Sequence, residues 1–583
     1  MNFFLIADFS LPKYCCGLFF LFMVSMSYAS NYADYPSSDA VASAHPLATN
    51  AGLAILAEGG NAFDAAVAVS AVLAVVEPYH SGLGGGGFWL LHQAKFKKNT
   101  FIDGREVAPF AASPKMFLDA KGQLIPNLSL NGGLSAAIPG EPAALVLIAK
   151  RFGRLPLARS LLPAIRIAEE GFLVENQLNY FINKDDRLVQ LKKHPNSAAI
   201  FLKQGKPYAV GERLIQRDLG KTLRLLAEQG HDGFYQGEIA KKLVTAVNKA
   251  GGIWTLHDLA AYQVKIREPL EGSFHQMHVI TAPLPSAGGV ALLTMLNILS
   301  ECPLSSLTKA ARVHYLVEAM RLVFWQRMEY LGDPDVVMIP LATLLSQNNA
   351  HDLRQMIHQH RATPSDTLPL KVKDKSGNPS TTHFSIIDRE GNRVAATLTI
   401  NYYFGSSVVA EGTGVLLNDG MDDFATSPGQ KNVFGLVGGI KNAIAPGKRP
   451  LSSMTPTFLE MPGRVAILGT PGGSRIPGMV LLASLVFNDA KGAISMVSKM
   501  RFHHQYLPDL LEFEPETFSP ALQVQLKAMG YHLSPLKEYY GDMQAITWDR
   551  VQNFVTAASD PRHIGLGTVV GNQFAGDVSN SKP

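Results

Sequence analysis

Alanine, leucine, valine and isoleucine recur with few breaks over residues 48–76, and the main interruption is Gly59-Gly60-Asn61. This apolar density predicts two helices, and the second, from Ala62 to Val76, is too short to span a membrane. We therefore expect a buried core helix here, within a first segment that is mostly helical. Further helical patterns cover residues 141–152, 157–170, 216–229, 237–250 and 308–331.

The pattern becomes polar after the last of these helices. Residues 363–380 contain prolines and lysines and show no period, which predicts an exposed flexible loop. Beyond them, two β-branched-rich runs at residues 384–388 and 393–401 predict strands. The intervening Arg389-Glu390-Gly391 predicts a hairpin loop with Gly391 in the left-handed conformation.

The turn also predicts the register of this hairpin. If Asp388 pairs with Asn392, Thr381 lies opposite Thr399. The two strands need a partner layer to bury their faces, so the sequence favours one interlocked domain over two separate ones.

The composition indicates a globular protein with a large core. The chain has 583 residues, of which 47% are apolar and 17% charged, with a net charge of +4. It is too apolar and too weakly charged to be disordered. Its 51 glycines and 35 prolines follow no period, which excludes a collagen-like architecture. No basic block is present, so we expect no nucleic-acid partner.

The amino terminus has the pattern of a secretory signal peptide. An apolar run over residues 14–25 follows Lys13, and Ser27-Tyr28-Ala29 places small residues at a cleavage site. The alternative is a membrane anchor, but the run is nearer to about 12 residues than to the roughly 20 that a spanning helix needs. We expect residues 1–29 to be removed, which predicts a periplasmic or secreted protein with no membrane attachment. The mature chain then retains Cys302 as its single cysteine, so no intramolecular disulfide is expected.

Some segments of this sequence match part of a known binding motif but lack the surrounding residues or elements that the motif needs. Residues 82–87 match G-x-G-x-x-G, but a helix precedes them and the predicted strand 88–92 follows, the reverse of a dinucleotide site. His358-Gln359-His360 and His503-His504 have no further ligands at metal-binding spacing, so solvated or core histidines are the default interpretation. We therefore expect neither a cofactor nor a metal.

One set of separated motifs closely resembles the γ-glutamyltranspeptidases. The resemblance begins at His45-Pro46-Leu47-Ala48, ends near Ser559-Asp560-Pro561-Arg562, and covers nearly the whole mature chain. The central motifs are Gly60-Asn61-Ala62-Phe63-Asp64, Asp103-Gly104-Arg105-Glu106, Ser380-Thr381-Thr382-His383-Phe384-Ser385, Thr397-Leu398-Thr399-Ile400-Asn401, Met421-Asp422-Asp423-Phe424, the stretch 446–454, and Pro471-Gly472-Gly473-Ser474-Arg475. Members of this family are N-terminal-nucleophile hydrolases, which implies a four-layer αββα sandwich made as one self-cleaving chain.

The resemblance implies a catalytic set. Thr381 matches the threonine before which the precursor is cut, and its freed α-amine, with a pKa near 8, can accept the proton of its own hydroxyl. Thr399 matches the threonine that hydrogen-bonds the nucleophile, which agrees with the hairpin register. Gly472 and Gly473 match the backbone donors of the oxyanion hole.

The resemblance also implies a substrate-binding set for a γ-glutamyl group. Arg105, Ser452 and Ser453 match the residues that bind its α-carboxylate, for which Arg supplies a two-pronged donor. Asn401 and Asp423 match residues that bind its α-ammonium.

One position departs from the family and one belongs to its lid. Gly420 stands where the family commonly has Gln or Glu as a further ammonium ligand, so the ammonium site lacks a side chain. Asn432-Val433-Phe434-Gly435 resembles the active-site lid, with Phe434 over the pocket.

The sequence therefore predicts a γ-glutamyl hydrolase and transferase without cofactor. Its donors are glutathione and related compounds, its acceptors are water, amino acids or peptides, and its two subunits are residues 30–380 and 381–583. One alternative is a β-lactam or glutaryl acylase on the same scaffold, which Gly420 makes less remote. Another is an uncut, inactive binding protein.

Overall fold

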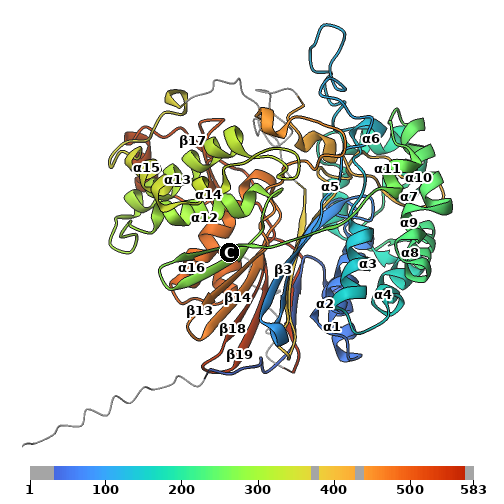
Figure 1. Cartoon of the computed structure of the whole chain (residues 1–583), viewed down its shortest axis with the longest axis horizontal. Helices are drawn as coiled ribbons and strands as arrows, with labels where there is room; N and C mark the ends of the chain where they lie inside the picture. The colour runs from blue at the N-terminus through green and yellow to red at the C-terminus, as the bar shows by residue number, and fades with distance from the viewer. Residues whose placement is uncertain (1–31, 369–379, 427–438, 572–583) are drawn as a thin grey trace, which may run out of the picture.

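Two β-sheets at the centre of the molecule each combine strands from distant parts of the chain (Figure 1). The structure is a computed structural model that describes residues 32–368, 380–426 and 439–571. The seven-stranded sheet has the order β20-β1-β11-β12-β2-β3-β8. Its strands are β1 Ala40–Ser43, β2 Gly86–Gln93, β3 Lys98–Gly104, β8 Lys265–Arg267, β11 Thr382–Ile387, β12 Arg393–Thr399 and β20 Leu566–Val569.

The six-stranded sheet lies against this first sheet and has the order β19-β18-β14-β13-β10-β9. Its strands are β9 Leu270–Phe274, β10 Met277–Thr281, β13 Thr457–Met461, β14 Arg464–Gly469, β18 Gln544–Asp549 and β19 Phe554–Ser559. Strands β11 and β12 contact β14, and β11 also contacts β18, so the two sheets pack face to face. Each sheet contains strands from before and after residue 380, which interlocks the two parts of the chain.

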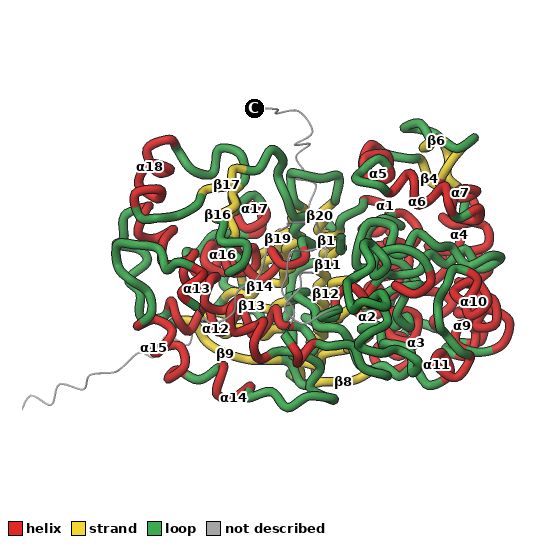
Figure 2. Tube along the Cα trace, turned by 90° about the horizontal axis from the view of Figure 1, so that it is seen from above, coloured by secondary structure: helices red, strands yellow, loops and turns green. Residues whose placement is uncertain are grey.

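A helical layer covers the outer face of each sheet (Figure 2). Helices α1 Pro46–Ala57 and α2 Ala62–Val76 pack on the seven-stranded sheet, whereas α12 Ala287–Leu299, α16 Ile476–Asn488 and α17 Ala493–Val497 pack on the other. The layers are therefore helix, sheet, sheet and helix. This arrangement confirms the αββα sandwich predicted from the sequence.

The helical patterns in the sequence correspond closely to helices in the structure. Those predicted after residue 140 are α3 Glu141–Phe152, α4 Leu157–Glu170, α8 Arg217–Gln229, α10 Gly237–Lys249 and α13 Lys309–Tyr330. Helix α2 begins at an Asn61 cap whose side chain accepts from the backbone of Asp64, while Asp64 accepts from Asn61 in return. All its residues are buried, as its unbroken apolar sequence predicts.

Shorter elements decorate both ends of the sandwich. The remaining α-helices are α5 Asn176–Ile182, α6 Arg187–Lys193, α7 Pro195–Phe201, α9 Asp232–Tyr235, α11 Leu256–Ala260, α14 Leu341–Leu344, α15 Gln347–Gln355 and α18 Pro520–Ala528. The remaining strands are β4 Phe172–Leu173, β5 Leu202–Lys203, β6 Lys206–Pro207, β7 Arg213–Leu214, β15 Phe502–His503, β16 Leu511–Phe513 and β17 Leu533–Pro535.

The β11–β12 hairpin has the predicted register. Thr382 pairs with Leu398, and the Asp388 amide donates to the Asn392 carbonyl at 3.0 Å. Gly391 has a φ of +83°, which confirms the left-handed position.

The glycine-rich segment after α2 is a close-packing element and not a nucleotide loop. It connects α2 to β2, so the helix precedes the strand, as the sequence indicates. A Cβ at Gly85 would lie 2.2 Å from the Thr399 carbonyl oxygen, which only glycine avoids.

The predicted exposed loop at residues 363–380 is only partly confirmed in the part that the structure describes, where Pro364, Asp366 and Thr367 are exposed but their neighbours are not. Thr363, Ser365 and Leu368 are buried, and Ser380 is 1% exposed. Ser365 donates to the Tyr506 carbonyl at 2.7 Å, so side-chain hydrogen bonds anchor a polar, aperiodic segment that contributes little apolar surface. Residues 369–379 lie outside the described part of the chain.

Candidate active site

Two threonine hydroxyls meet one carbonyl at the peptide bond between Ser380 and Thr381. The Thr381 hydroxyl donates to the Ser380 carbonyl oxygen at 2.5 Å, and the Thr399 hydroxyl donates to the same oxygen at 3.0 Å. Thr399 reaches this oxygen because the hairpin register places it opposite the start of β11. A carbonyl that accepts two hydroxyl hydrogen bonds is polarised for attack at its carbon.

The carboxyl end of α2 holds both sides of this peptide bond. The Thr382 hydroxyl donates to a buried carboxylate oxygen of Glu77 at 2.7 Å, and the Ser380 hydroxyl donates to the Tyr79 carbonyl at 2.5 Å. Burial raises the pKa of Glu77 from 4.5 to about 7. These contacts fix the backbone on either side of the candidate nucleophile.

The Arg105 guanidinium is fully buried between two carboxylates. It donates to Glu106 at 2.7 Å and to Asp423, and its Nε donates to the Pro450 carbonyl at 3.3 Å. Burial disfavours its charge, but the two carboxylates outweigh this cost and raise the pKa of Arg105. The residues predicted to bind the two charged ends of a glutamyl group are therefore in direct contact here.

The predicted carboxylate-binding serines lie next to Pro450. Ser452 and Ser453 are 5% and 8% exposed, and Arg327 of α13 donates to the Ser453 hydroxyl at 3.4 Å. Burial lowers the pKa of Arg327 to about 10, partly offset by Asp423, so the side chain stays charged at neutral pH. Within the described residues, Arg327 forms no ion pair, and its Nε has no hydrogen-bond partner.

Asn401 connects Thr399 to the segment that carries Gly420. Its backbone amide donates to the Thr399 hydroxyl at 2.8 Å, and its side chain donates to the Asp419 carbonyl at 3.0 Å. Asn401 adopts a φ of +78°, an uncommon conformation that turns the chain toward this segment. The residues directly after Asp419 form the short helix η4 Gly420–Asp423, which brings Asp423 to Arg105.

Gly420 needs no glycine-specific backbone, and a side chain fits there if Asn418 shifts by a few tenths of an ångström. Its φ lies outside the left-handed region, and a Cβ would lie 3.0 Å from Asn418 Oδ1 and 3.6 Å from the Glu106 carboxyl carbon. The second Glu106 oxygen, Oε1, is buried without a hydrogen-bond partner. A polar side chain at position 420 would therefore point toward a carboxylate that can accept a hydrogen bond.

Gly472 and Gly473 occupy the turn between β14 and α16. Their φ angles are +138° and +52°, a backbone that favours glycine at both positions. In the described residues neither backbone amide donates a hydrogen bond, which leaves two free donors at one turn. The strand that precedes this turn packs against β11, because the His383 ring lies on Gly469 at the end of β14.

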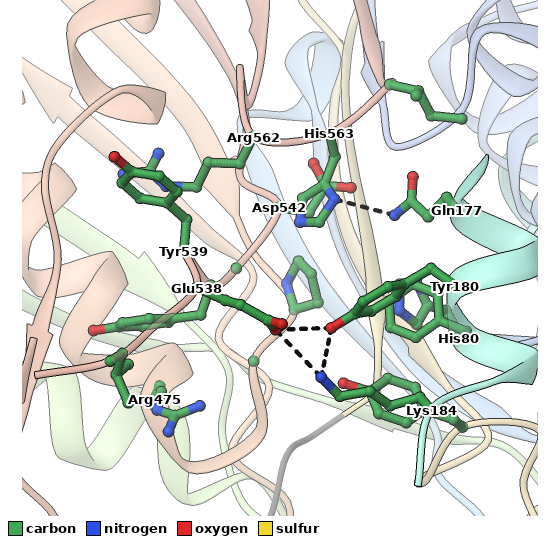
Figure 3. A pocket seen from close by; sticks show the side chains of 18 of the residues that line it. His80, Gln177, Tyr180, Lys184, Arg475, Glu538, Tyr539, Asp542, Arg562 and His563 are labelled. Carbon is green, nitrogen blue, oxygen red and sulfur yellow. Dashed lines mark hydrogen bonds and ion pairs between the residues drawn. The ribbon is translucent and has the colours of Figure 1, made fainter. Parts of the chain in front are cut away.

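A cavity of about 990 Å³ adjoins this turn (Figure 3). Pro471 and Gly472 border it on one side, and the other walls come from α5, the segment 536–542 and residues 562–564. His80, which follows Tyr79, also lines the cavity, and so does Tyr403, two residues beyond Asn401. The cavity therefore borders Gly472, one of the two candidate oxyanion donors, while Ser380 and Thr381 are not among its lining residues.

The remaining sequence predictions concern absences or residues outside the described ranges. In the three described ranges, no group of three or more His, Cys, Asp or Glu side chains could hold a metal ion. The helices of those ranges include none that is long and apolar enough to cross a membrane. Phe434 and residues 1–29 lie outside the described residues.

Sequence reasoning missed three buried side chains of this site, namely Glu77, Glu106 and Arg327. Glu106 belongs to the motif at residues 103–106, but the resemblance assigns it no role in the site. Arg327 lies in a helix whose polar residues interrupt an otherwise apolar pattern, and Glu77 ends an apolar helix. A charged residue within or just after a buried helix is the signal that could have identified both.

The fold and the site together define a class. A four-layer αββα sandwich, with a threonine directly before a central strand and beside a polarised peptide bond, is the arrangement of the N-terminal-nucleophile hydrolases. The model of the Gamma-glutamyltranspeptidase family matches residues 48–570. The chain belongs to the γ-glutamyltranspeptidase family.

Individual relatives agree with this assignment. A glutathione hydrolase proenzyme of Pseudomonas sp. (strain A14) is 42% identical over 497 residues, which cover 84% of this chain and 85% of that protein. The crystal structure of a cephalosporin acylase from Bacillus halodurans matches with a TM-score of 0.80 at 28% identity, and covers 92% of this chain and 96% of that one. A chain of Helicobacter pylori γ-glutamyltranspeptidase matches with a TM-score of 0.54 at 37% identity, covering 56% of this chain and 93% of its own.

Proposed function

We propose that the chain cuts itself between Ser380 and Thr381 and then hydrolyses or transfers γ-glutamyl groups through Thr381. The observation that carries this proposal is the Ser380 carbonyl, which accepts hydrogen bonds from the hydroxyls of both Thr381 and Thr399. The proenzyme name of the Pseudomonas relative supports a processed precursor.

Self-cleavage follows from this geometry in two steps. The Thr381 oxygen attacks the Ser380 carbonyl carbon and forms a C–O bond, the C–N bond breaks, and the hydroxyl proton passes to the departing nitrogen, which leaves an ester and a free Thr381 amine. Thr399 stabilises the negative charge that develops on the carbonyl oxygen. Water then hydrolyses the ester, and the products are residues 30–380 and a chain that begins at Thr381.

In the cut enzyme the same groups act on a γ-glutamyl amide. The Thr381 amine accepts the proton of its hydroxyl, the oxygen attacks the γ-carbonyl, and the amine of the donor leaves with a proton. The free amides of Gly472 and Gly473 supply the oxyanion donors. Water or an amine then attacks the ester and releases the glutamyl group.

The α-carbon end of the substrate binds at the ion-pair group, which is formed by Arg105, Glu106 and Asp423. Arg105, Ser452 and Ser453 bind the α-carboxylate of the substrate. Asp423 and Asn401 bind its α-ammonium. Arg105 and Asp423 pair with each other in the free protein, so a zwitterionic ligand replaces one ion pair by two without leaving a buried charge alone.

Donors are glutathione and related γ-glutamyl compounds, and acceptors are amino acids or peptides. The relatives named as glutathione hydrolases support the donor class. The signal-peptide pattern at the amino terminus supports a periplasmic or secreted location.

A second candidate, hydrolysis of β-lactam or glutaryl side-chain amides, is favoured by Gly420. An ammonium site with one side chain missing discriminates less against donors that lack the ammonium. The similarity to a cephalosporin acylase points in the same direction.

The deciding experiment compares two donors. Purified enzyme is given γ-glutamyl-p-nitroanilide and its des-amino counterpart, glutaryl-p-nitroanilide. We expect kcat/KM to be at least about tenfold higher for the glutamyl donor, because Asp423 otherwise loses a charged partner. Equal or higher values for the glutaryl donor would establish the acylase instead.

A further inference from the structure

Asn442 has a buried side chain between the two segments that carry the substrate-binding residues. It ends the short helix η5 Ile440–Asn442 and is 4% exposed. Its side-chain amide donates to the Asp423 carbonyl oxygen at 2.7 Å, and its side-chain oxygen accepts from the Leu451 backbone amide at 3.1 Å. One planar group therefore joins the backbone of an assigned ammonium ligand to the residue directly before Ser452.

Both backbone groups depend on Asn442. In the described residues, neither the Asp423 carbonyl nor the Leu451 amide has a second hydrogen-bond partner. A buried backbone group that loses its partner carries the full cost of its desolvation. The two segments are therefore most stable at the one separation that lets the side chain of Asn442 reach both.

The backbone around Asn442 is itself held on two sides. The Ala425 amide donates to the Asn442 carbonyl at 2.9 Å. The buried Lys448 ammonium donates to the carbonyls of Lys441 and Ala443 at 2.6 and 2.9 Å. These contacts fix the peptide units before and after Asn442, so its side chain is pre-organised between the two segments.

Arg105 also contacts both segments, but through groups that the substrate uses. It pairs with Asp423, and its Nε donates to the Pro450 carbonyl at 3.3 Å. A zwitterionic ligand exchanges the Arg105–Asp423 ion pair for its own two charges. Asn442 contacts only the backbone of Asp423 and Leu451, so its connection does not depend on that ion pair.

We propose that Asn442 is a positioning residue that sets the distance between the carboxylate-binding and ammonium-binding halves of the site, and thereby selects donors that carry both charges on one carbon. The inference rests on the proposed function and adds a residue that determines its specificity. A donor with one charge can shift toward one half of the site, whereas an α-amino acid group needs both halves at a fixed separation. A misplacement of about 1 Å in such an arrangement can lower turnover by about a hundredfold.

The test measures kcat/KM for three p-nitroanilide donors that differ only in these charges. The γ-glutamyl donor carries both, the glutaryl donor lacks the ammonium, and the 4-aminobutyryl donor lacks the carboxylate. Two selectivity ratios follow, each the glutamyl value divided by the value for one single-charge donor. Asn442→Ala should reduce both ratios by about fivefold or more, because the loss falls mainly on the glutamyl donor.

A second variant and a matched control separate positioning from stability. Asn442→Leu keeps most of the side-chain volume and removes both hydrogen bonds, so it should lower both ratios without leaving a cavity. Asn297→Ala removes another buried amide, in α12, which donates to the Leu345 carbonyl at 3.1 Å. This control should lower the thermal midpoint but keep the wild-type ratios.

Residue 442 lies outside both sheets, so its variants should still be cut, which a denaturing gel shows. Equal losses for all three donors, ratios that stay unchanged in both variants, or two variants that are not cut would each overturn the inference, because Asn442 would then support only the fold or self-cleavage. No turnover of any γ-glutamyl donor by the cut wild-type enzyme would instead refute the proposed function.

Discussion

Arg327 is the residue whose environment is least explained by the fold alone. A buried guanidinium without an ion pair is costly, and the charge of Asp423 offsets part of this cost. A substrate carboxylate beside Ser453 would supply the missing negative charge. We therefore expect Arg327 to position Ser453 and to strengthen carboxylate binding.

Arg327→Met should weaken γ-glutamyl donors that carry the α-carboxylate, mainly through KM, by about 1–3 kcal/mol in kcat/KM. Arg105→Lys should cost more, about 2–5 kcal/mol, because lysine lacks the two-pronged donor geometry. Steady-state kinetics with γ-glutamyl- and 4-aminobutyryl-p-nitroanilide checks both. An equal loss on the donor without the carboxylate would show that Arg327 only supports the fold.

Gly420 allows a second prediction about a single residue. The backbone accepts a side chain there if Asn418 moves by a few tenths of an ångström, and a glutamine would reach toward the unpaired oxygen of Glu106. Gly420→Gln should tighten glutamyl donors by about 1–2 kcal/mol, the scale of one charge-assisted hydrogen bond.

Gly420→Ala is the steric control for this change, and KM for glutamyl and glutaryl donors is the measurement. A gain confined to the glutamyl donor supports a restored ammonium ligand. A loss on both donors in both variants would mean that the site does not tolerate a Cβ, and no change would mean that the position does not contact substrate.

At the scale of elements, the hairpin could be predicted and the segment preceding it could not. Gly391 fixes the turn, the turn fixes the register, and the register places Thr399 near Thr381, so local sequence alone suffices for this pair. Residues 363–368 are held by hydrogen bonds to distant residues such as Tyr506, which no local pattern contains. Likewise, the Arg105–Asp423 ion pair joins residues far apart in the sequence, so only the resemblance to a family placed them in one site.

Helix α2 gives a prediction about pH. The pKa of Glu77 rises from 4.5 to about 7 on folding, so the folded protein holds this proton more tightly than the unfolded chain. The stabilisation is present below pH 4.5 and is lost as pH rises through 7, and amounts to about 3 kcal/mol. Glu77→Gln removes this titration.

The thermal midpoint of Glu77→Gln should therefore fall less than that of its parent between pH 5 and pH 8. Both proteins should carry Thr381→Ala, so that each is one uncut chain. Parallel midpoints across this range would contradict the assigned pKa.

At the scale of the whole molecule, the two sheets explain how a cut chain can remain one enzyme. The seven-stranded sheet pairs β11 with β1 and β12 with β2, and the six-stranded sheet pairs β13 with β10. Each pair joins a strand before residue 380 to one after it. Cleavage at Thr381 therefore leaves the backbone hydrogen bonds and the shared core in place.

The N-terminal sequence of the smaller chain of the purified protein tests the central claim most directly. We predict two chains on a denaturing gel, the smaller beginning Thr-Thr-His-Phe at Thr381, and one uncut, inactive chain for Thr381→Ala, which removes the attacking oxygen. A single wild-type chain, as in the binding-protein alternative, or a smaller chain that begins at any other residue, would contradict the assignment of Thr381 as the nucleophile.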